Sequence, residues 1–440
     1  MKLYKLPKIA TAPFCPSEVE GTVYVDPYKS AWKRYLATAG IGLMVSVGYM
    51  DPGNWATDIQ AGSQFGYQLL FVIFISNIFA IFLQAQCIKL GLGTGKDLAV
   101  ICRENLPQKV NYFFWFLAEI AIIACDVAEV LGTALALQLL FKIKISSAII
   151  WTAVDTLVVL GLQGKGVRRL EAIVLGLVAT IGLCYFFEIY LSHPNWVEVG
   201  SGFIPSLNII GNKEAWVIAI GILGATVMPH NLYLHSSLIL TRRTENTNIA
   251  KKKLYHMSLF DNALSLSLAF FINAAILIVA AAVFYKQGYH NIVEIQDAHK
   301  LLTPLLGAGL AGTFFALALF AAGQSSTITG TIAGQVILEG FLKLKIPCWQ
   351  RRMITRTLAL IPAYVGVSIL GEHSIGKMLI YSQVVLSLQL PFAIVPLMYF
   401  TGNKKIMKEW VNTKYLQCIG WIICFLVTAA NIWMLIQLMS

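Results

Sequence analysis

Two interruptions inside long apolar segments constrain this sequence more than any other feature. The first is Asp51–Asn54 (DPGN), in the middle of the first apolar segment, and the second is Met228–Asn231 (MPHN), in the middle of the sixth. Pro52, Gly53 and Pro229 break the helices, because proline has no N–H for the helical ladder and glycine is a poor helix former. Inside a bilayer, such a break persists only where the freed backbone lines a protected cavity or binds something. Two breaks in corresponding positions therefore predict a substrate site near the bilayer midplane.

The composition indicates a polytopic membrane protein. The chain has 440 residues, of which 57% are hydrophobic and 12% are charged, whereas soluble domains carry about 25% charged residues. The net charge of +11 is spread over many loops, which argues against a nucleic-acid partner. The eight cysteines form no C-x-x-C pair, and we interpret them as small buried hydrophobic residues. Residues 1–35 contain no secretory signal pattern, and no Walker A motif is present, so no nucleotide site is expected.

Eleven segments are long and apolar enough for a span of about 20 residues. They cover residues 36–65, 68–92, 111–140, 147–163, 168–192, 215–240, 258–285, 304–342, 353–371, 376–400 and 415–438. The eighth is too long for one span, and we expect its end to continue as helix beyond the membrane. Lys and Arg gather in alternate loops, which predicts a cytoplasmic N-terminus and an extracytoplasmic C-terminus.

Segments one to five and six to ten form two sets of five, and each set opens with a broken helix. Because five is odd, the second set must be inverted in the membrane relative to the first. We therefore predict an all-α fold with a five-plus-five inverted repeat, discontinuous helices 1 and 6, and an eleventh helix added outside the repeat. The expected divisions are an N-terminal tail (1–35), the first repeat (36–192), the second repeat (215–400) and helix eleven (415–440).

The side chains at the breaks favour a transition metal. Asp51 and Asn54 offer hard oxygen ligands, whereas the thioether of Met228 is soft and contributes little to Mg²⁺ or Ca²⁺. A break also exposes backbone carbonyls, and Ala225 supplies a candidate. This mixture favours Mn²⁺ and Fe²⁺, and soft Cd²⁺ is expected as a non-physiological substrate. The alternatives are a helix cap for Asp51 and a gap-filling core residue for Met228.

Other polar residues in apolar segments are candidates for proton transfer. His230 titrates near neutral pH and is a proton carrier, a metal ligand or a hydrogen-bonded core histidine. Asp126 and Glu129 share one helix face at i and i+3, which favours a proton relay or a static ion pair. Their expected partners are the arginines at the start of the ninth segment, Arg351, Arg352 and Arg356.

Two further features remain open. Gln383 and Gln389 are amides in the tenth segment, and either one lines the central cavity or makes interhelical hydrogen bonds. Gly323–Gln335 (GQSSTITGTIAGQ) is dense in small residues, which permit close helix packing.

These motifs resemble those of the Nramp family of divalent metal transporters over nearly the whole chain from about residue 30. Asp51–Asn54 resembles the family motif of the first helix, Ala225–Asn231 that of the sixth, and Gly323–Gln335 the "consensus transport" stretch. The resemblance implies a LeuT-like fold and inward symport of metal with protons, and the bacterial manganese and iron branch is the most similar. Magnesium-transporting relatives lack the methionine, so its presence argues against that branch.

The resemblance also implies roles for individual residues. The metal ligands would be Asp51, Asn54, Met228, the Ala225 carbonyl and Gln383. The proton route would use His230, Asp126, Glu129, Arg351 and Arg352.

The sequence leaves rival functions to exclude. One is a metal receptor that binds without transport, and another is a LeuT-fold symporter of another substrate. An enzyme is not expected, because the sequence shows no nucleophile–base pair. The expectations are a bacterial plasma-membrane location, metal and protons as substrates, no resident cofactor, no obligate protein partner, and a monomer.

Overall fold

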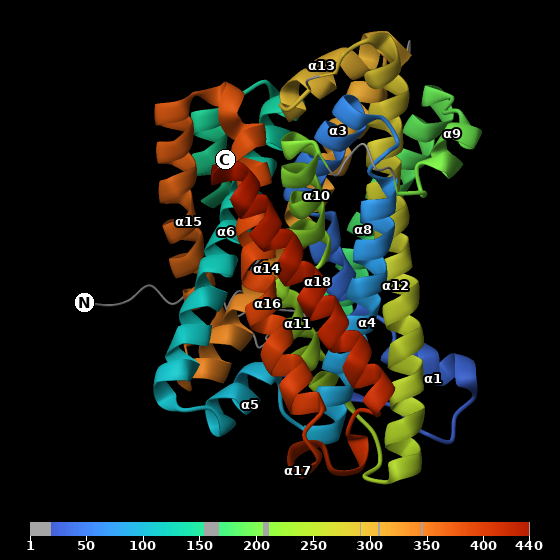
Figure 1. Cartoon of the computed structure of the whole chain (residues 1–440), viewed down its shortest axis with the longest axis vertical. Coiled ribbons are helices and arrows are strands. Elements are labelled where there is room, and N and C mark those ends of the chain that lie inside the picture. The colour runs from blue at the N-terminus through green and yellow to red at the C-terminus, as the bar shows by residue number, and fades with distance from the viewer. Residues whose placement is uncertain are drawn as a thin grey trace.

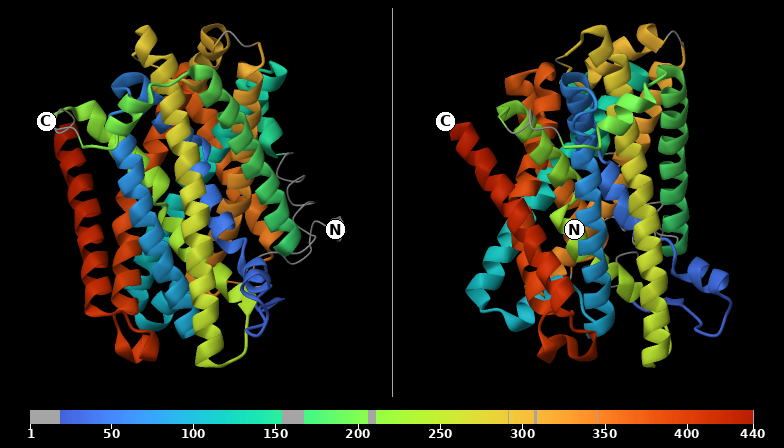
Figure 2. Two further views of the ribbon diagram at one scale, coloured as in Figure 1. Left: turned by 90° about the vertical axis from the view of Figure 1, so that its right-hand side faces the viewer. Right: turned by 45° about the vertical axis from the view of Figure 1, so that its right-hand side comes forward.

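This computed structural model describes residues 19–153, 167–205, 211–290, 292–306, 309–344 and 346–439. The molecule is an elongated bundle of long, roughly parallel helices (Figures 1 and 2). Within the described residues, nine helical stretches are long and apolar enough to cross a membrane. The prediction of an all-α membrane protein is therefore confirmed.

The spanning helices follow the predicted segments closely. The unbroken ones are α4 (Leu70–Thr94), α6 (Gln108–Phe141), α8 (Val167–Ser192), α12 (Asn248–Val283), α14 (Ala311–Leu342), α15 (Cys348–Leu370), α16 (Ile375–Thr401) and α18 (Lys414–Met439). The fourth predicted segment, 147–163, is helical from 145 to 153, and its remainder lies outside the described residues. The last helix, α18, runs along the outside of the bundle (Figure 2).

Both predicted breaks are present. The first span consists of α2 (Ile41–Ser46), η1 (Val47–Met50) and α3 (Pro52–Phe65), with Asp51 in an extended conformation between them at φ −68° and ψ 165°. The second consists of α10 (Lys213–Thr226), α11 (Pro229–Leu238) and η3 (Ile239–Thr241). A proline occupies the first position of α3 and of α11, where its missing N–H costs nothing.

Short elements close the two ends of the bundle (Figure 1). One end, called the α17 end below, carries α1 (Ala31–Thr38), α5 (Leu98–Asn105), α17 (Lys404–Met407) and η6 (Lys408–Trp410). The opposite end, called the α13 end, carries α9 (Trp196–Ser201), η4 (Tyr285–Gln287), α13 (Ile295–Leu306) and η5 (Glu372–Ser374). A two-stranded parallel sheet of β1 (Val23–Tyr24) and β2 (Arg242–Arg243) was not predicted.

The eighth segment differs from its prediction. Its first residues belong to α13, which contains Pro304, and α14 begins only at Ala311. The excess length therefore lies partly before the helix. The 32 residues of α14 still extend for about 48 Å at 1.5 Å per residue, so the helix also exceeds the hydrocarbon core.

Small residues allow α14 to pack closely against α6, as the sequence predicted. A Cβ added at Gly323 would lie 2.6 Å from Oγ1 of Thr133, and one at Gly330 would lie 2.6 Å from Oε1 of Glu129. A β-carbon at either position would require the side chain of Thr133 or Glu129 to move away. The stretch 323–335 thus brings the backbone of α14 against the polar face of α6.

Candidate metal site

The first break turns Asp51 toward Asn54. Oδ1 of Asp51 accepts hydrogen bonds from the backbone N–H and from the side-chain Nδ2 of Asn54, both at 2.8 Å. Asp51 therefore caps α3, as one of the alternative interpretations held. Its carboxylate is fully buried, which a capping role alone does not require.

The second break brings a backbone carbonyl to the same place. In a continuous helix the Ala225 carbonyl would accept from the N–H of residue 229, but Pro229 has none. The carbonyl instead accepts from Nδ2 of Asn54 at 3.0 Å. A hydrogen bond therefore joins the two broken helices at the point where each one is interrupted.

A third helix, α16, contributes Gln383. Its Nε2 donates to Oδ2 of Asp51 at 3.3 Å, whereas its Oε1 has no hydrogen-bond partner within the described residues. The side chain reaches this position because Gly53 and Gly224 lack β-carbons, which would overlap Gln383. Of the two amides considered in the sequence, Gln383 is thus the one beside Asp51.

Met228 is adjacent to this group but is held by apolar contacts. It occupies the extended position before α11 and is fully buried. Its side chain packs with Ala121 of α6 and Leu386 of α16. Leu386 lies three residues beyond Gln383 on the same helix face. Hydrogen bonds thus link four of the five predicted ligands, and the break itself places the fifth beside them.

One residue at this site was missed in the sequence. Asn273 of α12 donates through Nδ2 to the carbonyl of Tyr49 at 2.7 Å and to Oδ1 of Asn54 at 3.2 Å. It therefore holds Oδ1 of Asn54, so that Nδ2 of the same amide points toward Asp51. The sequence signal was only an asparagine in an apolar segment, with no spacing that relates it to either break.

The site combines one carboxylate, two amides, a carbonyl and a thioether. Within the described residues, no three His, Cys, Asp or Glu side chains group as a metal-binding cluster. The donor set is therefore poor in charge, and the thioether is the feature that distinguishes it from a Mg²⁺ or Ca²⁺ site.

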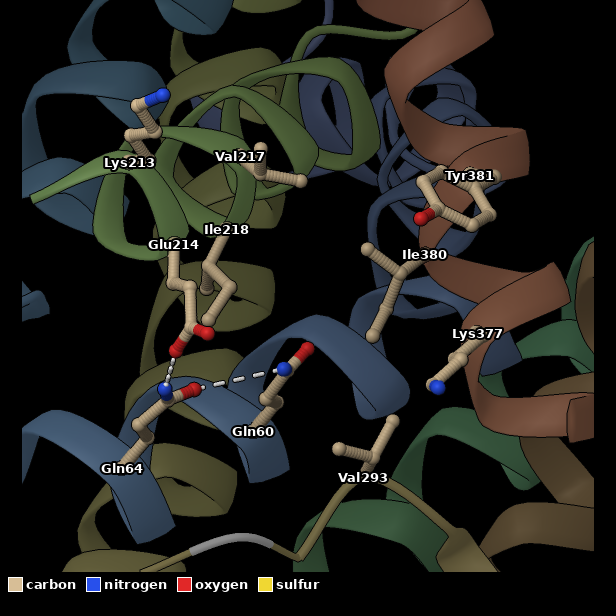
Figure 3. Close-up of a pocket in the computed structure, with 10 residues that line it drawn as sticks. All are labelled: Gln60, Gln64, Lys213, Glu214, Val217, Ile218, Val293, Lys377, Ile380 and Tyr381. Carbon is tan, nitrogen blue, oxygen red and sulfur yellow. Dashed lines mark hydrogen bonds between the residues drawn. The ribbon is translucent and has the colours of Figure 1, made fainter. Parts of the chain in front are cut away.

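A cavity of about 360 Å³ opens beside the loop that precedes α13, where Val293 lines it (Figure 3). It lies between α3, α10 and α16, the helices that carry Asn54, Ala225 and Gln383. Gln64 donates to Glu214 across it. Its lining residues are Gln60, Gln64, Lys213, Glu214, Val217, Ile218, Val293, Lys377, Ile380 and Tyr381.

Three residues, Thr57, Gly221 and Ile380, lie between this cavity and the predicted ligands. A Cβ on Gly221 would lie 3.0 Å from Cγ2 of Thr57 and 3.9 Å from Cγ2 of Ile380. Each of these residues is one helical turn from a predicted ligand, on α10, α3 and α16 respectively.

On the other side of the site, a hydrogen-bonded chain joins three helical elements. Nδ1 of His235 on α11 lies 3.0 Å from Oε1 of Gln84 on α4, and Nε2 of Gln84 donates to the Tyr49 hydroxyl of η1 at 2.6 Å. All three are buried. The site is thus closed toward the α17 end as well.

The predicted proton-route residues lie beside the site on α6 and α11. Nε2 of His230 lies 3.7 Å from Sγ of Cys125, and Sγ lies 3.6 Å from Oε1 of Glu129. Arg356 approaches Oε2 of Glu129 at 3.9 Å. Asp126 follows Cys125 on α6 and is also buried. Cys125 was interpreted as a small hydrophobic residue, but it connects the histidine with the acid.

The arginines divide differently from the prediction. Arg351 pairs with Glu119 at 3.0 Å, seven residues before Asp126 on α6. The side chain of Arg352 lies outside the described residues.

Comparison with known proteins agrees with this arrangement. Residues 42–437 match the Nramp family, described as "Natural resistance-associated macrophage protein-like". The chain belongs to the Nramp family. It is 53% identical over 439 residues to the "Divalent metal cation transporter MntH" of Ralstonia nicotianae, covering 100% of this chain and 99% of the relative. It is 54% identical over 432 residues to MntH 1 of Pseudomonas aeruginosa, covering 98% of each.

Solved structures agree as well. This Nramp chain superposes on the crystal structure of the Eremococcus coleocola manganese transporter with a TM-score of 0.88 and 38% identity, covering 95% of this chain and 90% of that one. MhsT, solved in complex with L-phenylalanine, shares the fold alone at 14% identity and a TM-score of 0.61, covering 90% of this chain and 98% of that one. The predicted LeuT-like fold is thereby confirmed.

Proposed function

We propose that this Nramp protein is a divalent metal cation transporter that imports Mn²⁺ and Fe²⁺ together with protons, and accepts Cd²⁺ as a non-physiological substrate. The observation that carries the proposal is the meeting of both helix breaks in one buried group of Asp51, Asn54 and the Ala225 carbonyl. Curated relatives more than half identical to the chain are named divalent metal cation transporters.

The metal would be held by one carboxylate and by several neutral donors of the chain. Asp51, the Ala225 carbonyl, Asn54 and Gln383 supply oxygen atoms that replace water, and Met228 supplies sulfur. Metals with strong hydration and a preference for oxygen, Mg²⁺ and Ca²⁺, gain little from the thioether. Selectivity therefore rests on one soft ligand rather than on net charge.

Transport would follow alternating access of the two halves around the buried site. Movement at the contact between Thr57, Gly221 and Ile380 would open the outer cavity. Separation of Tyr49, Gln84 and His235 would open the α17 end. We assign the halves to residues 36–192 and 215–400, and we expect a monomer to be sufficient.

The proton would travel beside the metal rather than through it. It would bind near Asp51 or His230 and pass by way of Cys125 to Glu129 and Asp126. The arginines Arg351, Arg352 and Arg356 would assist its release. The contacts of Cys125 with both His230 and Glu129 support this route.

The orientation would follow the distribution of basic residues. The α17 end carries Arg242, Arg243, Lys404, Lys405 and Lys408 on its short elements. We infer that this end faces the cytoplasm of a bacterial cell and that the protein resides in the plasma membrane.

Uptake into proteoliposomes tests this function. Purified protein would be reconstituted with a pH dye inside, and Mn²⁺ would be added outside with excess Mg²⁺. The expected result is Mn²⁺ uptake that Mg²⁺ does not inhibit, with acidification of the interior. Asp51→Ala should abolish uptake, and uptake that survives in this variant would refute the ligand assignment.

Two other outcomes would change the proposal. Mn²⁺ uptake without acidification would leave the ligands in place and make Glu129 and Asp126 members of static ion pairs. Mn²⁺ binding by calorimetry without any uptake would instead support a receptor.

A further inference from the structure

A second group of buried polar side chains lies between α3 and α8, away from the metal ligands. Trp55 and Asp58 are three residues apart on α3, and Tyr185 and Glu188 are three residues apart on α8. Residues at this spacing share a helix face. The rings of Trp55 and Tyr185 meet edge to face with centroids 5.1 Å apart, so the two faces adjoin. All four side chains are 2% exposed or less.

The polar atoms of this group have no hydrogen-bond partners within the described part of the chain. Both carboxyl oxygens of Asp58, both of Glu188, the Tyr185 hydroxyl and Nε1 of Trp55 are buried and unpaired. Most buried polar groups in proteins are paired, so neighbouring exceptions require a physical explanation. Packing does not provide one, because apolar side chains fill the same space without the loss of hydration.

Among the residues that the structure describes, no cation is in electrostatic range of Glu188. Cys184 and Tyr185 of its own helix are in electrostatic range of this region, and Tyr185 is also in range of Asp58. Besides α3, which carries Asp58, the helices that contact α8 most extensively are α14, α12 and α2, and their described residues add no further titratable group in range of Glu188. A negative charge on Glu188 would therefore be uncompensated, whereas a bound proton neutralises it.

We propose that Glu188 is a second proton-binding site and that Tyr185 couples it to α3 through Trp55 and Asp58. On protonation, an O–H bond forms between a proton from water and a carboxylate oxygen of Glu188. On release the same bond breaks and the proton returns to water, and no electron is transferred. A carboxyl group holds a proton unaided, whereas the described residues bring no three His, Cys, Asp or Glu side chains together as a metal-binding cluster.

The coupling follows from the double role of α3. The helix lines the outer cavity through Gln60 and Gln64 and touches α8 through Trp55. Opening of the cavity by movement of α3 would therefore separate Trp55 from Tyr185 and admit water to Glu188. This step rests on the proposed transport cycle, but it involves neither His230 nor Glu129.

Infrared spectroscopy of the full-length protein in lipid tests the site directly. The C=O stretch of a protonated carboxyl should be present at neutral pH, and Glu188→Gln should remove part of it. Glu198→Gln is the matched control, because Glu198 is 51% exposed and pairs with Lys286. A band that is equally strong in wild type and Glu188→Gln would overturn the proposal.

Transport adds a second readout. Glu188→Gln should bind Mn²⁺ like the wild type in calorimetry but lose part of the stimulation of uptake by external acid, and Glu188→Asp should restore it. Tyr185→Phe keeps the Glu188 carboxyl and should shift the pH dependence of Mn²⁺ uptake. This variant provides the test if Glu188→Gln does not fold. An unchanged pH profile in both would overturn the proposal. Absence of acidification in the wild type would contradict the proposed proton coupling instead.

Discussion

At the scale of single residues, Met228 is the proposed ligand that should decide between metals. Met228→Ala should still transport Mn²⁺, because the oxygen ligands remain, but Ca²⁺ or Mg²⁺ should now compete. Inhibition of Mn²⁺ uptake by Ca²⁺ in proteoliposomes measures the effect. Met434→Ala removes an equally buried methionine from α18 and should leave Ca²⁺ without effect. Continued exclusion of Ca²⁺ by Met228→Ala would show that softness is not the basis of selectivity.

Asn273 should act through Asn54 rather than on the metal. Asn273→Ala leaves Oδ1 of Asn54 without its donor, so the amide is free to rotate away from Asp51. Loss of an orienting partner of this kind costs about 10–100-fold in metal affinity. Calorimetric titration with Mn²⁺ should show this loss. Asn262→Ala on the same helix, which removes a bond to the Ile81 carbonyl, should bind Mn²⁺ like the wild type.

The sequence could predict residues whose role is local to a break. Asp51, Asn54 and the Ala225 carbonyl follow from the prolines beside them, because a lost N–H acts within four residues. Cys125 and Asn273 could not be predicted in this way. Their partners lie on other helices, and the contacts depend on how α6 and α12 rotate within the bundle.

At the scale of elements, Gly224 should control the approach of α10 to α16. A Cβ there would overlap the Gln383 carbonyl, and Ser387 also lies within contact. Gly224→Ala should therefore displace α16, lower Mn²⁺ affinity and lower the melting temperature. Gly176→Ala is the matched control, since no atom lies within 4 Å of its added Cβ. It should be neutral or stabilising, by up to about 1 kcal/mol. Equal effects of the two substitutions would contradict the close-approach argument.

The N-terminus of α2 is anchored from α12 and should loosen when that anchor is weakened. Asp261 accepts from the N–H of Gly42 at 2.7 Å and from that of Gly40 at 3.4 Å. Asp261→Asn removes the charge from these bonds, which are worth about 1.5–3 kcal/mol when charged. Hydrogen exchange of the α2 amides should accelerate by roughly tenfold or more. Asp297→Asn, at an exposed ion pair, should leave α2 unchanged.

Helix boundaries divide into those set by sequence and those set by contacts. The breaks at Asp51 and Met228 were predictable because proline acts locally. The end of α13 was not, because Pro304 lies within that helix rather than at its end. Nor was the pairing of Val23 with Arg242, since a strand of two residues carries no periodicity.

At the scale of the whole molecule, the charge pattern predicts termini on opposite sides of the membrane. An epitope at the C-terminus should be accessible to antibody on intact spheroplasts, and one at the N-terminus only after permeabilisation. The physical reason is the retention of Lys- and Arg-rich loops on the cytoplasmic side. Accessibility of both epitopes on intact cells would contradict an odd number of spans.

The Ala225 ligand has an unusual genetic basis. Every residue has a carbonyl, so substitution at position 225 does not delete it, and a larger side chain at this fully buried position would act by displacing α10 instead. The carbonyl is free because Pro229, four residues away, has no N–H to donate to it. The identity of residue 229, and not that of residue 225, therefore determines whether this carbonyl is free to bind. A survey of variants that scores only the residues nearest the proposed metal site would assign the exposure of this carbonyl to the wrong position.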